Sequence, residues 1–179
     1  LLPSKVMLHF CRGKNLKEPA SPELIAEMTG RIHSLAERYN GAERGELESL
    51  DVAFAVGEGR LVDARTVRIE GGDGADETIE ADAVVVTTGS VPRFPDNLEP
   101  NGEEIIAPRH ISHLESLPKS MVVVGGGVTG TEFAYGFNAL GVEVAWVVDD
   151  NGVLPGFDHE LGSALSAELL RQGVTLVQQ

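Results

Sequence analysis

The sequence is poor in cysteine. Cys11 is the single cysteine among 179 residues, so no disulfide can form within the chain. Structural disulfides are characteristic of oxidising compartments, and a lone cysteine therefore favours a reducing one. We expect the protein to be cytoplasmic.

Positive charge and long apolar runs are also scarce. The chain has 14 basic and 28 acidic residues, and its net charge of −14 would repel nucleic acid and anionic membranes. The longest apolar runs, Met121–Val124 and Val144–Val148, are far shorter than the roughly 20 residues that cross a bilayer. The first residues lack the order of a signal peptide. We therefore expect neither a nucleic-acid partner nor a membrane partner.

Two helical segments are predicted in the first third of the chain. The first is short and stops at Gly13. Ser21 is a good N-cap for a longer second helix, which is expected to weaken at Gly41 and Gly45. Apolar residues in this helix recur at three- and four-residue steps and predict one buried stripe: Leu24, Ile25, Met28, Ile32, Leu35 and Tyr39.

The middle of the chain is β-rich. Four short segments predict a small antiparallel meander: 52–56, 60–63, 66–70 and 77–81. The glycine-rich run 71–76 between the last two is predicted to be a turn. Residues 83–90, "AVVVTTGS", are different because their apolar run is continuous. Such a run is typical of a strand that is buried on both faces.

The last third of the chain alternates between strand and helix patterns. A proline-rich connection precedes it, and its order is strand, helix, strand, helix, strand, with the second helix over about 158–172 and the last strand at the chain end. This order predicts a parallel sheet and an α/β fold.

Gly125, Gly127 and Gly130 form the pattern G-x-G-x-x-G between the first strand and the first helix of this region. In dinucleotide-binding folds the first glycine allows a tight turn, the second lets the pyrophosphate approach, and the third lets the helix pack closely. The loop is therefore predicted to bind a dinucleotide through Gly125, Gly126, Gly127, Val128, Thr129 and Gly130. The alternative is a tight strand-to-helix turn without a ligand.

An acidic pair follows the second strand of this region. Asp149 lies about 20 residues after the glycines, where a carboxylate accepts hydrogen bonds from an adenosine ribose. Together with Asp150 it would repel a 2′-phosphate, so NAD is favoured over NADP. An arginine further along the chain could reverse this preference.

Three motifs occur in an order that resembles one family: "LPSK" near the start, "TTGSVP" before the connector and "GGGVTGTE" after it. The chain resembles the flavin-dependent pyridine nucleotide–disulfide oxidoreductases, which include dihydrolipoamide dehydrogenase, glutathione reductase and the soluble pyridine nucleotide transhydrogenases. The resemblance implies Rossmann-like FAD- and NAD(P)-binding domains of three-layer β/β/α character, with a small antiparallel β meander, truncated at both ends. It implies a partial FAD-binding domain at 1–95, a connector at 96–118 and a partial NAD-binding domain at 119–179.

The resemblance also implies site residues. Lys5 matches a lysine beneath the flavin ring, and Glu132 matches a glutamate that pairs with this lysine. Gly57 matches a backbone contact to the FAD adenosine. The turn that closes over the FAD is matched by Thr88, Gly89 and Ser90. No metal ligands are expected.

The chain departs from the family where its redox disulfide would lie. The second cysteine of the family's pair corresponds to Leu1, and Cys11 is expected to be a buried small side chain rather than a redox thiol. No histidine matches the one that protonates thiols in the disulfide reductases. The first glycine motif and the dimerisation domain are expected outside these residues, so we expect a piece of a longer, homodimeric enzyme that is inactive by itself.

These departures favour an oxidoreductase that moves hydride between NAD(P)H and FAD without a redox disulfide, as in the transhydrogenases. If Leu1 is only a boundary, a dihydrolipoamide dehydrogenase is the alternative. A flavin-free NAD-binding module and an inactive fragment stay open as well. In the favoured interpretation, Lys5 stabilises the negative charge of the reduced flavin and Glu132 holds the lysine in place.

Overall fold

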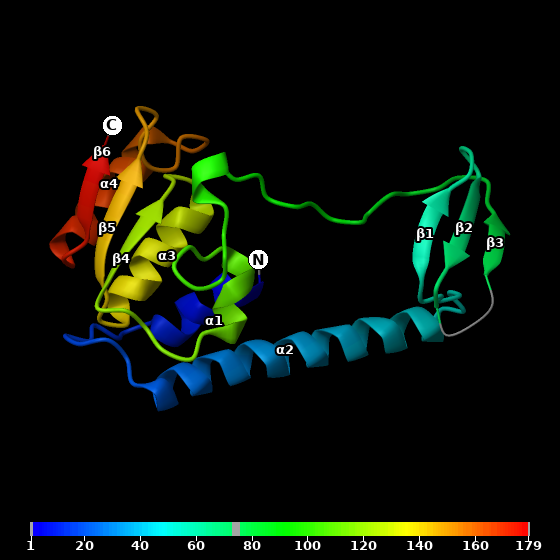
Figure 1. The fold of residues 1–179 in the computed structure, drawn as a ribbon, viewed down its shortest axis with the longest axis horizontal. Helices are drawn as coiled ribbons and strands as arrows, with labels where there is room; N and C mark the ends of the chain where they lie inside the picture. Colours follow the sequence, from blue (N-terminus) through cyan, green and yellow to red (C-terminus); the bar gives the residue numbers. More distant parts are fainter. Residues whose placement is uncertain (1, 73–75, 179) are drawn as a thin grey trace. The chain divides into compact units, whose positions relative to one another are not determined.

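The computed structural model describes residues 2–72 and 76–178, and they form two compact units (Figure 1). The first unit comprises residues 1–37 and 96–179, and the second comprises residues 38–95. Each unit contains one sheet of three strands. The two sheets differ in strand direction and in burial.

The sheet of the first unit is parallel, as predicted. Its strands are β4 (Ser120–Val124), β5 (Glu143–Val148) and β6 (Thr175–Gln178), in the order β4-β5-β6. Helices α3 (Val128–Ala139) and α4 (His159–Arg171) connect them. The predicted strand–helix–strand–helix–strand order is therefore confirmed.

The second of these helices begins where the sequence predicts. Asp158 is the N-cap of α4, and its carboxylate accepts a 2.8 Å hydrogen bond from the Glu160 N–H. This bond satisfies one of the four N–H groups that the first helical turn leaves unpaired.

The start of the chain forms two helices. The first lies wholly in the first unit, and the second belongs to it only up to Glu37. Helix α1 (Leu2–Cys11) ends before Gly13, whose φ of 77° stops it as predicted. Helix α2 (Pro22–Ser49) follows Ser21, whose Oγ accepts a 3.4 Å hydrogen bond from the Leu24 N–H. The Ser21 cap is therefore confirmed.

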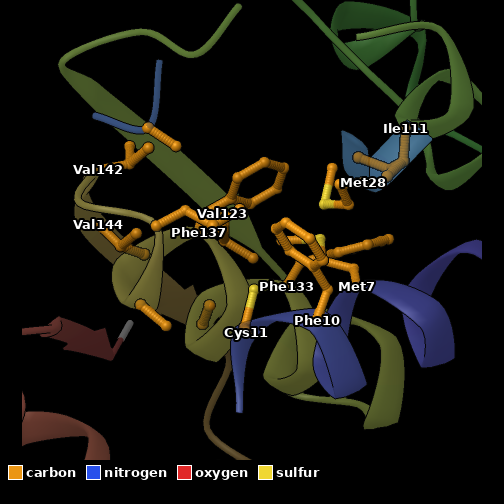
Figure 2. Close-up of a cluster of buried hydrophobic side chains, with 14 of the residues drawn as sticks. Met7, Phe10, Cys11, Met28, Ile111, Val123, Phe133, Phe137, Val142 and Val144 are labelled. Carbon is orange, nitrogen blue, oxygen red and sulfur yellow. The ribbon is translucent and has the colours of Figure 1, made fainter. Parts of the chain in front are cut away.

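The core of the first unit lies where α1 meets α3. Figure 2 shows side chains of both helices directed toward one another, with Met7 and Cys11 from α1 and Phe133 and Phe137 from α3. Gly136 permits the close approach, because a Cβ there would lie 2.4 Å from the Met7 Cε. From the predicted stripe of α2, Ile25, Met28 and Ile32 are buried.

Two predictions about α2 are wrong. Tyr39 is 56% exposed rather than buried, and the helix continues through Gly41 and Gly45 to Ser49. A glycine costs a helix about 1 kcal/mol, which good helix formers around it can offset. An ion pair between Arg44 and Glu48 at 2.9 Å adds to this part of the helix.

Two short 3₁₀ helices lie between the units' sheets in the sequence. These are η1 (Asp96–Leu98) and η2 (Pro108–His113). Ile111 of η2 is fully buried in the core of the first unit, and Figure 2 shows it beside Met28. The Ala107 N–H donates to His110 Nδ1 at 2.9 Å and fixes the start of η2.

The second unit contains the predicted antiparallel meander. Strands β1 (Glu58–Leu61), β2 (Thr66–Glu70) and β3 (Glu77–Glu80) pair in sequence order. The Asp63 carboxylate closes the first hairpin by accepting the N–H groups of Arg65 at 2.8 Å and Thr66 at 2.9 Å. Part of the predicted turn 71–76 lies outside the described residues.

Two predicted strands are absent from the described residues. Residues 52–56 and 83–90 are irregular, and Phe54, Val85 and Val86 are 52%, 81% and 63% exposed. An apolar run becomes a buried strand only when neighbouring strands supply hydrogen bonds and other layers cover its faces. No described strand pairs with either run, so the prediction of a strand buried on both faces is wrong here.

Within residues 2–72 and 76–178, no helix is long and apolar enough to cross a membrane.

Candidate functional site

The glycine loop joins β4 to α3. Gly125 has a φ of 116°, which favours glycine, and a Cβ on Gly130 would lie only 2.0 Å from the Gly125 carbonyl oxygen. At Gly127, the N-cap of α3, an added Cβ would meet nothing within 4 Å. The tight turn, the open approach and the close packing predicted for the three glycines therefore all occur. Val128 and Thr129 begin the helix.

Gly126 contributes a contact that the sequence pattern did not predict. A Cβ at this position would lie 2.1 Å from the carbonyl oxygen of Gly152, and the Leu154 N–H donates to the Gly126 carbonyl at 2.7 Å. The loop after β5 is thus fastened to the glycine loop. Gly126 is the first x of G-x-G-x-x-G, a position that the motif leaves open, so the motif does not predict this contact.

Trp146 was also missed by the sequence analysis. This side chain of β5 is fully buried, and its indole N–H donates to the Gly125 carbonyl at 2.9 Å. The Gly125 N–H in turn donates to the Val147 carbonyl at 2.9 Å. Period-2 burial in β5 would have marked Trp146 as a core residue, but its hydrogen bond depends on the folded loop.

Asp149 follows β5 directly and is exposed. Its carboxylate accepts the Asn151 N–H at 3.0 Å on Oδ1 and the Asn151 Nδ2 at 2.9 Å on Oδ2. Each carboxylate oxygen has two acceptor positions, so one position on each oxygen stays available. The neighbouring Asp150 is exposed as well.

Lys5 and Glu132 form an ion pair, as the resemblance implied. Lys5 lies on α1 and Glu132 on α3, and the packing of these two helices brings the side chains together. The lysine side chain is 58% exposed, whereas the glutamate side chain is only 10% exposed. Glu132 Oε1 accepts from the lysine, while Oε2 is buried and has no hydrogen-bond partner among the described residues.

The remaining predicted residues belong to the second unit. Gly57 precedes β1 and packs against β2, because a Cβ there would lie 2.7 Å from the Ile69 Cγ2. Thr88, Gly89 and Ser90 are exposed, and Gly89 has a φ of 78°. Their relation to Lys5 and to the glycine loop stays a prediction.

Cys11 is buried, which agrees with the sequence analysis. Its Sγ lies 3.5 Å from the Gly136 carbonyl, and burial raises the pKa of this thiol to about 12. A buried thiol with a raised pKa is a poor nucleophile. Leu1, at the position of the family's second redox cysteine, lies outside the described residues. Across residues 2–72 and 76–178, no three His, Cys, Asp or Glu side chains gather as a metal site.

Known proteins resemble the chain over most of its length. A quinone-type NAD(P)H dehydrogenase of Mycobacterium tuberculosis is 32% identical over 85% of the chain. A dihydrolipoyl dehydrogenase of Chlorobaculum parvum is 34% identical over 85% of it. A soluble pyridine nucleotide transhydrogenase of Mycobacterium bovis is 33% identical over 84% of it. In each comparison the chain spans 32% of the length of the curated relative.

The solved structures confirm the predicted α/β fold. LpdA from Mycobacterium tuberculosis matches 99% of the chain with a TM-score of 0.84 and 29% identity, and the match covers 41% of LpdA. The flavoprotein disulfide reductase RclA of Escherichia coli matches with a TM-score of 0.72 at 19% identity, and this match shows the fold alone. The family model described as "Pyridine nucleotide-disulphide oxidoreductase" matches residues 2–179. The chain therefore belongs to the pyridine nucleotide-disulphide oxidoreductase family.

Proposed function

We propose that the protein is an FAD-dependent oxidoreductase that transfers hydride between a nicotinamide nucleotide and the flavin. The observation that carries this proposal is the ion pair between exposed Lys5 and buried Glu132. Glu132 lies one turn into α3, the same helix whose first residues form the glycine loop. One short helix therefore carries both the charged pair and the loop.

The glycine loop fits the pyrophosphate of a nicotinamide dinucleotide. The backbone is open to approach at Gly127, and the first N–H groups of α3 have no partners within the helix. These groups and the positive end of the helix dipole attract phosphate oxygens. We assign the loop from Gly125 to Gly130 to this role, within an NAD-binding domain over 119–179.

The charged pair fits a site beside a flavin. A buried carboxylate oxygen without a partner is costly, and Glu132 Oε2 is such an atom among the described residues. A polar group that binds next to the pair would relieve this cost. We assign residues 1–95 to an FAD-binding domain, in which Gly57 contacts the adenosine and Thr88, Gly89 and Ser90 close over the FAD.

When bound, FAD supplies the ring system that exchanges hydride with the nicotinamide. Lys5 holds a positive charge where negative charge develops on reduction, and this electrostatic stabilisation is prepared before the reaction. Glu132 fixes the lysine from its buried position on α3. Lys5 is therefore the proposed catalytic residue, and Glu132 the residue that positions it.

The loop after β5 favours NAD over NADP. Asp149 keeps one acceptor position on each oxygen for ribose hydroxyls, and Asp150 adds a second negative charge beside it. A 2′-phosphate would be repelled by both carboxylates.

Within the family we favour a transhydrogenase-like enzyme without a redox disulfide. The buried Cys11, with its raised pKa, supplies no reactive thiol. The alternative is a dihydrolipoamide dehydrogenase, and the 32% identity to a quinone-type NAD(P)H dehydrogenase makes a quinone a third acceptor to test. We propose a homodimer, as is typical of the family.

The visible absorption spectrum of the purified full-length protein, before and after anaerobic addition of NADH, tests the proposal. A flavin spectrum that bleaches directly to reduced flavin supports the disulfide-free enzyme. A long-wavelength thiolate–flavin band would instead support the dihydrolipoamide dehydrogenase. Absence of flavin would leave only an NAD-binding module. Rates with thio-NAD, a quinone and lipoamide then identify the acceptor.

A further inference from the structure

Trp146 is a buried side chain of β5 whose indole N–H donates a hydrogen bond inside the protein. The side chain is fully buried, and a buried indole N–H needs an acceptor. The acceptor is the Gly125 carbonyl at 2.9 Å, which belongs to the first glycine of the loop. A core residue on β5 is thus hydrogen-bonded to the proposed cofactor site.

Residue Gly125 is held by contacts on both sides of its Cα. Its N–H donates to the Val147 carbonyl at 2.9 Å, and its carbonyl accepts from Trp146. The start of α3 packs on the same carbonyl oxygen, because a Cβ on Gly130 would lie 2.0 Å from it. The Gly125 carbonyl is therefore directed into the protein rather than toward a ligand.

The direction of this carbonyl determines the direction of the next N–H. In a planar trans peptide the C=O and the following N–H point to opposite sides, and no described peptide bond is cis. The Gly126 N–H must therefore point away from Trp146. It donates no hydrogen bond to any other residue that the structure describes.

We propose that Trp146 is a positioning residue for dinucleotide binding. By holding the Gly125 carbonyl inward, it keeps the Gly126 N–H turned outward as a donor for an oxygen of the dinucleotide pyrophosphate. Without the indole N–H, the buried carbonyl loses its hydrogen-bond partner, and the Gly125–Gly126 peptide is held less firmly in this orientation. This inference rests on the proposed function, because it concerns the same nucleotide site.

The test replaces Trp146 in the full-length protein with 3-benzothienylalanine, which has sulfur in place of the indole N–H and nearly the same shape. The Kd values of the oxidised enzyme for NAD⁺ and for ADP-ribose, neither of which can reduce the flavin, are measured by calorimetry. Both are expected to rise about tenfold, the effect of one charge-assisted hydrogen bond. In steady-state kinetics KM for NADH should rise, whereas kcat at saturating NADH should not change.

Val144→Ala is the matched control, since Val144 is a buried residue of β5 that does not bond to the glycine loop. It should lower the melting temperature and leave both Kd values unchanged. If it weakens binding as much as the Trp146 replacement does, general destabilisation explains the effect and the inference is wrong. Unchanged binding in the Trp146 variant would also overturn it, while the proposed function would stand. If the unmodified protein binds neither ligand, the proposed function fails, and the inference with it.

Discussion

The two three-stranded sheets of this protein are held together in different ways. In the parallel sheet, every second residue of β5 is buried: Val144, Trp146 and Val148 are 3%, 0% and 2% exposed. In the antiparallel meander, β1 and β3 are exposed along their whole length. Packing against α3 supports the first sheet, whereas backbone hydrogen bonds and turn chemistry support the second.

This difference separates the proposed site residues into two groups. Lys5, Glu132 and the glycine loop lie on elements that share one core, so side chains distant in sequence are brought into contact. Gly57 and residues 88–90 lie in a unit where local contacts dominate. A site built on packed elements is fixed more precisely than one built on exposed segments.

The largest effect is expected from Lys5→Met, which removes the positive charge from the ion pair of the first unit. Methionine keeps much of the apolar stem, but Glu132 becomes a buried carboxylate without its partner. Reduction of the flavin by NADH should slow about a hundredfold, as on loss of one preorganised electrostatic contact. Stopped-flow absorption of the full-length protein measures this rate.

Lys17→Met is the control for that substitution, because Lys17 is an exposed lysine in the same unit and has no described ion pair. It should leave the rate unchanged. Equal slowing in both variants would mean that net charge, rather than the ion pair, controls the reaction.

Gly130→Ala should be the next most harmful change. The new Cβ would lie 2.0 Å from the backbone oxygen of Gly125, which cannot move without disturbing the bond from Trp146. Overpacking of this kind costs about 2 kcal/mol of unfolding free energy, and binding of NAD⁺ to the oxidised enzyme should weaken too. Urea denaturation and calorimetry measure the two effects.

Gly127→Ala provides the comparison within the same loop, because an added methyl group there meets nothing within 4 Å. Its unfolding free energy should stay close to that of the unmodified protein. A loss equal to that of Gly130→Ala would contradict the distinct roles assigned to the two glycines.

The parallel sheet and its glycine loop could be predicted because their signals are local. The strand, the glycines, the helix and the acidic pair follow one another along the chain, and each has its own physical reason. The Lys5–Glu132 pair came only from the family resemblance, since nothing local links a residue of α1 to one of α3. The bond from Trp146 to Gly125 could not be predicted, because it depends on how the strand and the loop pack.

The predictions that the structure contradicts lie in the second unit. Residues 83–90 have the composition of a buried strand, but strand formation needs partners that composition does not supply. The continuation of α2 past Gly41 and Gly45 was not predicted, because the low helix propensity of glycine was given too much weight. Intrinsic propensity is a weak prior, and neighbouring pairs such as Arg44 with Glu48 act against it.

The burial of Cys11 should make the stability of the first unit sensitive to high pH. Burial raises the pKa of this thiol from 9.0 to about 12. Its neutral form is favoured in the folded state, so the stabilisation is complete below about pH 9 and is lost as the pH rises toward 12. Between these values the unfolding free energy should fall by about 1.4 kcal/mol per pH unit.

Urea denaturation at pH 8 and pH 10 measures this loss, and Cys11→Ala is its control. Other groups also titrate in this range, so the relevant quantity is the difference between the two proteins. The variant should show a shallower dependence on pH. Parallel curves would indicate that the thiol ionises equally well in the folded state.

Gly45→Ala is a substitution in the second unit that is expected to stabilise the protein rather than to destabilise it. Gly45 lies in the part of α2 that belongs to the second unit, and an added methyl group would meet nothing within 4 Å. Alanine should therefore stabilise this segment by about 1 kcal/mol. The same substitution at Gly136 in α3 would bring a Cβ within 2.4 Å of the Met7 Cε, so no gain is expected there. Thermal unfolding followed by circular dichroism compares the two variants.

The smallest effect is expected from Asp63→Ala in the hairpin between β1 and β2. Hydrogen bonds from the Arg65 N–H and from Thr66 hold the pKa of the Asp63 carboxyl below its usual range. The ionised form therefore stabilises the turn above about pH 4, the value for an unfolded chain, and this support is lost as the pH falls through the lowered pKa. Without the carboxylate, the amide hydrogens of Arg65 and Thr66 should exchange faster.

Hydrogen exchange measured by NMR detects this local change even where the melting temperature hardly moves. Asp82→Ala, at an exposed aspartate of the same unit, should leave both amides protected as before. The amide hydrogens of the glycine loop, in the first unit, should exchange at the same rate in both variants as in the unmodified protein. If Asp63→Ala leaves the exchange of Arg65 and Thr66 unchanged, backbone pairing alone holds the hairpin, and turn chemistry has no part in the difference between the two sheets.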